Sequence, residues 1–234
     1  MSSVVIETHK LNGFYGDAKV LFDIDFRLNE GEVVGVLGAN GAGKSSFLKA
    51  ISGLMKVEPG MITLRGEAIG GSEPGEIVRK GIAMVPEGRR LFPSMTVEEN
   101  LKMGAFAGRK GRWDINSVYA QFPILKEKRN VPSTSLSGGQ QQMVAIGRAL
   151  MSNPDVLMCD EISLGLAPVV IKDIYDSLPN IVSEGMSVVI IEQDVMVAQR
   201  CSQRLYCLQE GRVSLEGASE ALTRDQISQA YFGI

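Results

Sequence analysis

The chain has 234 residues, with 24 lysines and arginines against 27 aspartates and glutamates. This length suits one α/β domain with an inserted subdomain. The near balance of charge gives no basic surplus that would argue for nucleic-acid binding, so we expect no nucleic acid among the partners. The cysteines Cys159, Cys201 and Cys207 show no metal-ligand spacing, and their odd number favours a reduced, cytoplasmic setting.

Membrane-targeting signals are missing from the sequence pattern. The N-terminal residues have no cationic start followed by an apolar stretch, as a signal peptide would. No run approaches the ~20 apolar residues that are needed to span a bilayer. We therefore expect any role at a membrane to come through a partner.

Several short segments read as strands. Apolar and polar residues alternate over residues 22–28, which predicts a half-buried antiparallel strand, and residues 4–10 are expected to pair with it. The apolar runs at 82–85, 156–159 and 188–191 predict buried central strands of a mostly parallel sheet. The sequence therefore indicates a parallel sheet with an antiparallel addition near the N-terminus.

A glycine-rich segment carries the strongest functional signal. Residues 38–45 read Gly-Ala-Asn-Gly-Ala-Gly-Lys-Ser, after an apolar run at 32–37 and before a helical pattern at 46–55. Strand, glycine-rich loop and helix in this order are typical of a phosphate-binding loop, because glycines let backbone N–H groups crowd around phosphate oxygens. We expect Lys44 to reach the β- and γ-phosphates of a nucleoside triphosphate and Ser45 to hold Mg²⁺.

The stretch over residues 87–135 has a helical pattern with glycine and proline breaks, which predicts an inserted helical subdomain. After it, residues 136–140 read Leu-Ser-Gly-Gly-Gln and open a predicted helix over 141–151, with Ser137 as its N-cap. The two glycines expose backbone donors at the positive end of that helix. We therefore expect a second anion site there.

Two acids end the apolar run Val-Leu-Met-Cys at 156–159. Asp160 at the carboxyl end of a strand can order the coordination shell of Mg²⁺. Glu161, the next residue, can polarise an attacking water molecule. Further on, apolar residues at helical spacing predict one helix over 171–182, with Pro168 near its start.

With these three motifs in this order, the chain resembles the ATPases of ABC transporters over essentially its whole length. The resemblance implies an α/β fold: a P-loop NTPase (RecA-like) core with a mostly parallel sheet, an antiparallel β subdomain and an inserted helical subdomain. Residues 1–234 would form one ATPase domain, with the core in 1–86 and 141–234 and the helical subdomain, including the signature motif, in 87–140. ATP and Mg²⁺ are the implied cofactors.

The resemblance also implies a site shared by two subunits in a head-to-tail dimer. Tyr15 would stack on adenine, and the signature motif of one chain would cover the ATP on the phosphate loop of the other. The implied nucleotide-binding residues are Tyr15, Gly38, Asn40, Gly41, Ala42, Gly43, Lys44, Ser45, Ser46, Ser137, Gly138, Gly139 and Gln140.

The chain departs from the family pattern at informative positions. Glu87 stands where the family usually has a glutamine, and it can still contact Mg²⁺ through a carboxylate oxygen. Gln193 stands where the family has a switch histidine, so it can donate to a γ-phosphate but cannot titrate near neutral pH. Ile162 and Ala167 replace a common proline and aspartate. The candidate catalytic residues are Glu161, Lys44 and Gln193, and the candidate metal ligands are Ser45, Asp160 and Glu87.

Residues 86–93, 163–168 and 191–193 together resemble the LivF-type subgroup, the ATPases of bacterial importers of branched-chain amino acids. This implies a second, different ATPase subunit (with a homodimer possible for the chain alone), two transmembrane permease subunits, and indirectly a periplasmic binding protein. The chain would lie at the cytoplasmic face of the cell membrane. Three alternatives stay open: another cargo such as amides or urea, a soluble ABC ATPase of DNA repair or translation, and a nucleotide-gated scaffold that does not hydrolyse ATP.

Overall fold

Two sheets organise the computed structural model, which describes residues 3–183 and 185–232. The first sheet is antiparallel, in the order β2-β1-β4-β5, with β1 (Val4–Tyr15), β2 (Ala18–Asn29), β4 (Ile62–Leu64) and β5 (Glu67–Ala68). The predicted pairing of residues 4–10 with 22–28 is confirmed, and it extends to a hairpin that joins Val4 to Asn29 and Tyr15 to Ala18. Ile24, Phe26 and Leu28 of β2 are buried, as their period of two predicts, whereas Phe22 is only half-buried and its neighbour Leu21 is buried instead.

The second sheet follows the order β10-β9-β3-β8-β7-β6. Its strands are β3 (Val33–Leu37), β6 (Ile82–Val85), β7 (Val156–Asp160), β8 (Ser187–Ile191), β9 (Arg204–Gln209) and β10 (Arg212–Ala218). All neighbouring pairs are parallel except β9 with β10, which confirms the three predicted central strands. The carboxyl ends of β3, β7 and β8 therefore meet at one edge, where ligands of parallel sheets commonly bind.

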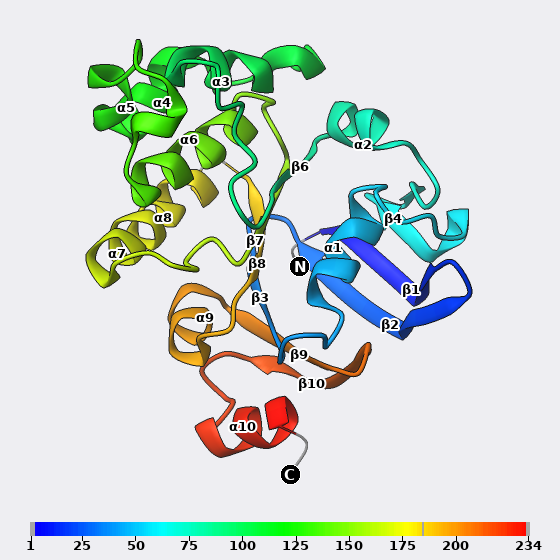
Figure 1. The fold of residues 1–234 in the computed structure, drawn as a ribbon. Helices are drawn as coiled ribbons and strands as arrows, with labels where there is room; N and C mark the ends of the chain where they lie inside the picture. Colours follow the sequence, from blue (N-terminus) through cyan, green and yellow to red (C-terminus); the bar gives the residue numbers. More distant parts are fainter. Residues whose placement is uncertain (1–2, 184, 233–234) are drawn as a thin grey trace.

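The residues of β7 alternate between two hydrophobic cores. Val156 and Met158 face a core that also holds α1 (Lys44–Ile51) and the antiparallel sheet. Leu157 and Cys159, which alternate with them, face the other core, formed with the helices that follow β6. In Figure 1 the antiparallel sheet and these helices accordingly lie on opposite sides of the parallel sheet.

Helices fill the remainder of the described chain. They are α2 (Pro74–Lys80), α3 (Val97–Met103), α4 (Ile115–Gln121), α5 (Pro123–Glu127), α6 (Gly138–Leu150), α7 (Pro168–Asp176), α8 (Leu178–Val182), α9 (Val195–Cys201) and α10 (Arg224–Phe232), with short 3-10 turns at Pro59–Met61, Gly104–Ala107 and Ser133–Ser135. Helices α3 to α6 gather at one end of the molecule (Figure 1). In the described part of the chain, no helix combines the length and the apolar character needed to cross a bilayer.

Three predicted helices differ from the structure, and the one expected over 141–151 spans Gly138–Leu150. The single helix expected over 171–182 is wrong, because α7 ends at Asp176 and α8 begins at Leu178. Pro179 lacks the N–H that would continue the α7 ladder, and its ring would clash with the carbonyl of Tyr175. The helix after the phosphate loop ends at Ile51 instead of reaching 55, since Gly53 takes a left-handed conformation with φ 75°.

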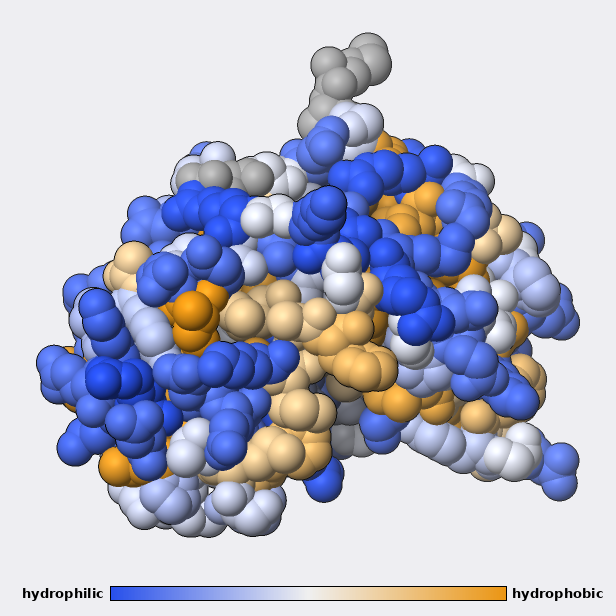
Figure 2. Space-filling model, turned by 90° about the horizontal axis from the view of Figure 1, so that it is seen from above, coloured by the Kyte–Doolittle hydropathy of each residue, from blue (hydrophilic) through white to orange (hydrophobic). Residues whose placement is uncertain are grey.

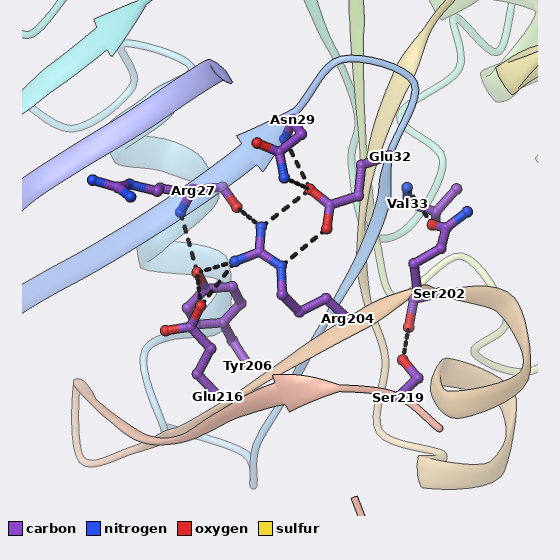
Figure 3. A network of polar contacts seen from close by, with 10 residues as sticks. Arg27, Asn29, Glu32, Val33, Ser202, Arg204, Tyr206, Glu216 and Ser219 are labelled. Carbon is purple, nitrogen blue, oxygen red and sulfur yellow. Dashed lines mark hydrogen bonds and ion pairs between the residues drawn. The ribbon is translucent and has the colours of Figure 1, made fainter. Parts of the chain in front are cut away.

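An arginine joins the two sheets near the end of β2 (Figure 3). Arg204 on β9 donates from Nε and Nη2 to the two carboxylate oxygens of Glu32, at 2.9 and 3.1 Å. Its Nη2 also donates to the Arg27 carbonyl at 2.6 Å, and its Nη1 donates to Glu216 at 2.8 Å. This bidentate contact fixes the antiparallel sheet against β3, the strand that leads into the phosphate loop.

Candidate functional site

The phosphate loop connects β3 to α1, and its backbone requires glycine. Gly41 and Gly43 adopt left-handed conformations, with φ 84° and 102°, that side chains disfavour. At Gly38 a Cβ atom would lie 2.4 Å from the carbonyl oxygen of Leu208. The glycine spacing therefore follows from backbone conformation at two positions and from a close approach to β9 at the third.

Lys44 is the first residue of α1, and its side chain, which is 4 % exposed, contacts the loop. Its Nζ donates to the carbonyl oxygens of Gly38 and Ala39 at 2.8 and 3.1 Å. The same atom lies 3.3 Å from Oε1 of Glu161. The ammonium group is thus held between the loop and the acid at the end of β7, where a phosphate oxygen would be a strong acceptor for it.

Ser45 and Asp160 form the second contact between the loop and the sheet. Ser45 Oγ donates to Asp160 Oδ1 at 3.2 Å. Burial raises the pKa of Asp160 above its usual range, while the hydrogen bond from Ser45 opposes this shift. The described residues include no group of three or more histidine, cysteine, aspartate or glutamate side chains placed to hold a metal ion. One hydroxyl and one carboxylate suit Mg²⁺, which usually keeps several waters and takes substrate phosphate oxygens as further ligands.

Gln193, which follows β8, contacts both the phosphate loop and the end of β7. Its Nε2 donates to Glu161 Oε2 at 2.6 Å and to Asn40 Oδ1 at 3.1 Å. Glu161 itself has φ 47°, an uncommon backbone conformation for a residue with a side chain, and its N–H donates to the Ile191 carbonyl at 3.1 Å. Such backbone strain persists where the surrounding contacts hold it in place, and here strands β7 and β8 provide those contacts.

These side chains surround a cavity of about 500 Å³. Glu87, which follows β6 after one proline, is exposed at its border. The described residues that line the cavity are Val20, Asn40, Gly41, Gly43, Lys44, Ser45, Ser46, Glu87, Glu161, Leu164 and Gln193. Gly38 and Ala42, which belong to the loop, are buried. The structure thus brings the predicted catalytic residues and most of the predicted phosphate-loop residues to one place.

Tyr15 lies at the side of the phosphate loop, with its ring at the surface. Its hydroxyl is 3.3 Å from Ser46 Oγ, and Lys49 Nζ donates to it at 3.3 Å. The same ammonium lies 5.6 Å from the centre of the ring. The side chain is 46 % exposed, so one face of the phenol remains available for stacking.

The residues of the signature motif are held at the start of α6, apart from this cavity. Ser137 accepts from the Gln140 N–H at 3.3 Å, and the Gln140 side chain accepts from the Ser137 N–H at 3.1 Å, which confirms the predicted N-cap as a capping box. At Gly139 a Cβ atom would lie 2.4 Å from Cγ1 of Val170 on α7, while Gly138 is close to Arg89. Neither Ser137 nor the residues 138–140 are among the described residues that line the phosphate-loop cavity.

Sequence reasoning did not single out the contacts that hold the end of β8. Glu192 is buried and accepts hydrogen bonds from Ser163 and Tyr175. The available signal was an acidic residue directly after the wholly apolar run of β8, where a carboxylate needs partners inside the protein.

Known proteins resemble this chain in sequence. The family model described as "ABC transporter" matches residues 21–163. A protein of Pseudomonas aeruginosa described as the high-affinity branched-chain amino acid transport ATP-binding protein BraG is 41 % identical over 227 residues, which cover 96 % of this chain and 97 % of that protein. A probable branched-chain amino acid transport ATP-binding protein LivF of Archaeoglobus fulgidus is 34 % identical, with 98 % and 99 % covered.

Solved structures resemble the fold as well. The ADP conformation of an ATP-binding cassette of an ABC transporter superposes with a TM-score of 0.82 at 26 % identity, covering 97 % of this chain and 94 % of the other. A dimeric structure of a bacterial ABC transporter cassette gives a TM-score of 0.80 at 26 % identity, with 93 % and 100 % covered. Both likenesses extend over nearly the whole chain.

Proposed function

We propose that this chain, which belongs to the ABC transporter family of ATP-binding proteins, is the ATP-hydrolysing subunit of a bacterial importer of branched-chain amino acids. One observation carries the hydrolytic role: Lys44, Glu161 and Gln193 meet at the phosphate loop in a continuous set of contacts. The similarity to a branched-chain amino acid transport protein over 96 % of this chain supports the cargo.

Substrate binding is assigned to the loop and its neighbours. The backbone N–H groups of residues 41–46 and the Lys44 ammonium hold the phosphates of ATP, and Tyr15 stacks on the adenine. Ser45 and Asp160 would hold Mg²⁺, and Glu87, at the border of the phosphate-loop cavity, would be a further ligand. When bound, Mg²⁺ neutralises charge that develops on the phosphoryl oxygens.

Glu161 orients a water molecule and accepts its proton as the water oxygen bonds to the γ-phosphorus, while the bond from that phosphorus to the β–γ bridging oxygen breaks and ADP leaves. Gln193 fixes the Glu161 carboxylate through the bond from Nε2, and its amide cannot change its charge near neutral pH. Ser137, Gly138, Gly139 and Gln140 complete the site of a second cassette, because they lie apart from the phosphate loop of their own chain. Hydrolysis therefore depends on closure of the dimer.

A groove at the other end of the molecule is assigned to the permease. It has a volume of about 430 Å³ and lies between α2, α3 and α6, where Phe106 is 90 % exposed. The view from the end where α3 lies shows a mostly polar surface crossed by apolar side chains (Figure 2). We assign the groove to a cytoplasmic helix of a permease subunit. Its lining includes Phe92, Met103, Phe106, Arg79, Arg90 and Arg148. Through it the chain would lie at the cytoplasmic face of the membrane, on the side opposite the periplasmic binding protein.

Phosphate release from Mg·ATP tests the hydrolytic role. Glu161→Gln should bind ATP as the wild type does and lose turnover by about a hundred-fold or more, because general-base assistance is removed. Glu210→Gln, an exposed acid in the turn after β9, is the matched control and should hydrolyse normally. Normal turnover in Glu161→Gln would refute the assignment of the base.

A further inference from the structure

Glu192, the residue between β8 and Gln193, is 1 % exposed, and its carboxylate accepts hydrogen bonds from two side chains. Its Oε2 accepts from Ser163 Oγ at 2.7 Å, and its Oε1 accepts from the hydroxyl of Tyr175. Burial raises the pKa of Glu192, while these donors oppose the shift.

The first partner places this carboxylate beside the proposed base. Ser163 is two residues after Glu161 and belongs to the loop over 161–166, whose Leu164 lines the phosphate-loop cavity. Glu192 is joined directly to Gln193, which donates to Glu161. Its own N–H donates to the Val36 carbonyl at 3.2 Å, on the strand that leads into the phosphate loop. Residue 192 therefore connects the ends of β3 and β8 through its backbone, and its side chain holds the loop that follows β7.

The second partner extends the connection to the signature motif. Tyr175 lies on α7, and Val170 near the start of the same helix packs so closely on Gly139 that a Cβ atom there would be 2.4 Å from it. A displacement of α7 would thus be transmitted both to Glu192 and to the start of α6.

An apolar side chain of similar size would cost less free energy to bury at this position than a carboxylate. The presence of a carboxylate here is therefore explained by the hydrogen bonds that its two oxygens accept from Ser163 and Tyr175. We propose that Glu192 is a positioning residue, which fixes the loop over 161–166 and α7 so that Glu161 and Gln193 stay aligned on the phosphate loop. This inference rests on the proposed function of Glu161 as the base.

Steady-state ATP hydrolysis by the full chain tests the proposal. Glu192→Leu should lower kcat about ten-fold while KM for ATP stays within about two-fold, because a small misplacement of the base affects chemistry more than binding. Glu192→Gln is the matched control, since an amide of the same length can accept from Ser163 and donate to the Tyr175 oxygen. It should keep most of the wild-type kcat.

Ser163→Ala gives a second route to the same result if Glu192→Leu folds poorly. It should lower kcat by itself and add nothing to the loss in Glu192→Leu, because both changes break one contact. A wild-type kcat in either single variant would overturn the inference, and so would an equal loss in Glu192→Leu and Glu192→Gln.

Hydrogen exchange separates failure of this inference from failure of the proposed function. If the wild type does not hydrolyse ATP, the proposed function fails, yet the positioning contact can still be measured. Amides of residues 161–166 should exchange faster in Glu192→Leu than in Glu192→Gln, with the phosphate-loop amides unchanged. Equal exchange in the two variants would overturn the positioning role.

Discussion

At the scale of single residues, the site is built around a buried cation. Lys44 finds two carbonyl acceptors and one carboxylate inside the fold. Two hydrogen bonds and one ion pair stabilise the ammonium group, so the charge can be kept in a site that is largely shielded from water. A phosphate group entering the loop meets this cation already in place.

Replacing that cation should weaken nucleotide binding. Lys44→Ala removes a charge-assisted hydrogen bond to phosphate, which predicts a rise of about ten-fold or more in the Kd for ATP. Lys56→Ala, at an exposed position beyond α1, should leave the Kd unchanged. A titration that gives Lys44→Ala the wild-type affinity would contradict the role of Lys44.

At the scale of elements, capping decides where the helices begin. The Thr96 hydroxyl accepts from the Glu99 N–H at 3.2 Å, and Glu99 Oε2 accepts from the Thr96 N–H at 2.8 Å. This capping box starts α3, which packs against α6 through Leu101 and Gly147. It thereby fixes one wall of the groove assigned to the permease.

Loss of the cap should be measurable as a loss of stability. Thr96→Ala is expected to lower the free energy of unfolding by about 1 kcal/mol, because the first turn of α3 loses a hydrogen-bond acceptor. Urea denaturation followed by circular dichroism provides the measurement, with Thr134→Ala, at an exposed threonine, as the control. Equal midpoints for both variants would show that the cap contributes nothing.

The sequence predicted the features that depend on neighbouring residues. The strand, glycine-rich loop and helix at 33–51, the N-cap at Ser137 and the strand pairing of residues 4–10 all follow from local patterns. The break before α8 was also present locally, as Pro179, but the helical spacing of the apolar residues outweighed it.

Contacts between distant parts of the chain could not be predicted in this way. Glu192 meets Ser163 across 29 residues and Tyr175 across 17, and Gln193 meets Glu161 across 32. Only the parallel order of β3, β8 and β7 brings these positions together. A sequence pattern can identify such residues, but the order of the strands in the sheet decides which of them are in contact.

At the scale of the whole molecule, two distant surfaces must cooperate. The phosphate-loop cavity lies at the carboxyl edge of the parallel sheet, whereas the groove near Phe106 lies between α2 and the helices at the other end. Helix α6 contributes to that groove and begins with the signature motif. Closure of a dimer on ATP can therefore move the groove relative to the sheet, which is the motion that a permease would follow.

A surface substitution can separate the role of the groove from ATP hydrolysis. Phe106→Ser removes the most exposed aromatic of the groove, so we expect amino-acid uptake by the assembled transporter to fall several-fold through weaker docking. Phosphate release by the isolated chain should not change. Phe14→Ser is the control, because Phe14 is also exposed but lies on the β1–β2 hairpin. Full uptake with Phe106→Ser would contradict the assignment of the groove.

The most direct test of the proposed function, an ATP-hydrolysing subunit that drives import, is uptake of labelled amino acids in cells that lack this chain. The wild type should restore uptake of leucine, isoleucine or valine, and Glu161→Gln, produced at the same level, should not. Restored uptake of none of these amino acids by the wild type would contradict the proposed cargo and direct the search to amides and urea. Equal uptake with wild type and Glu161→Gln would contradict the claim that hydrolysis at this site drives import.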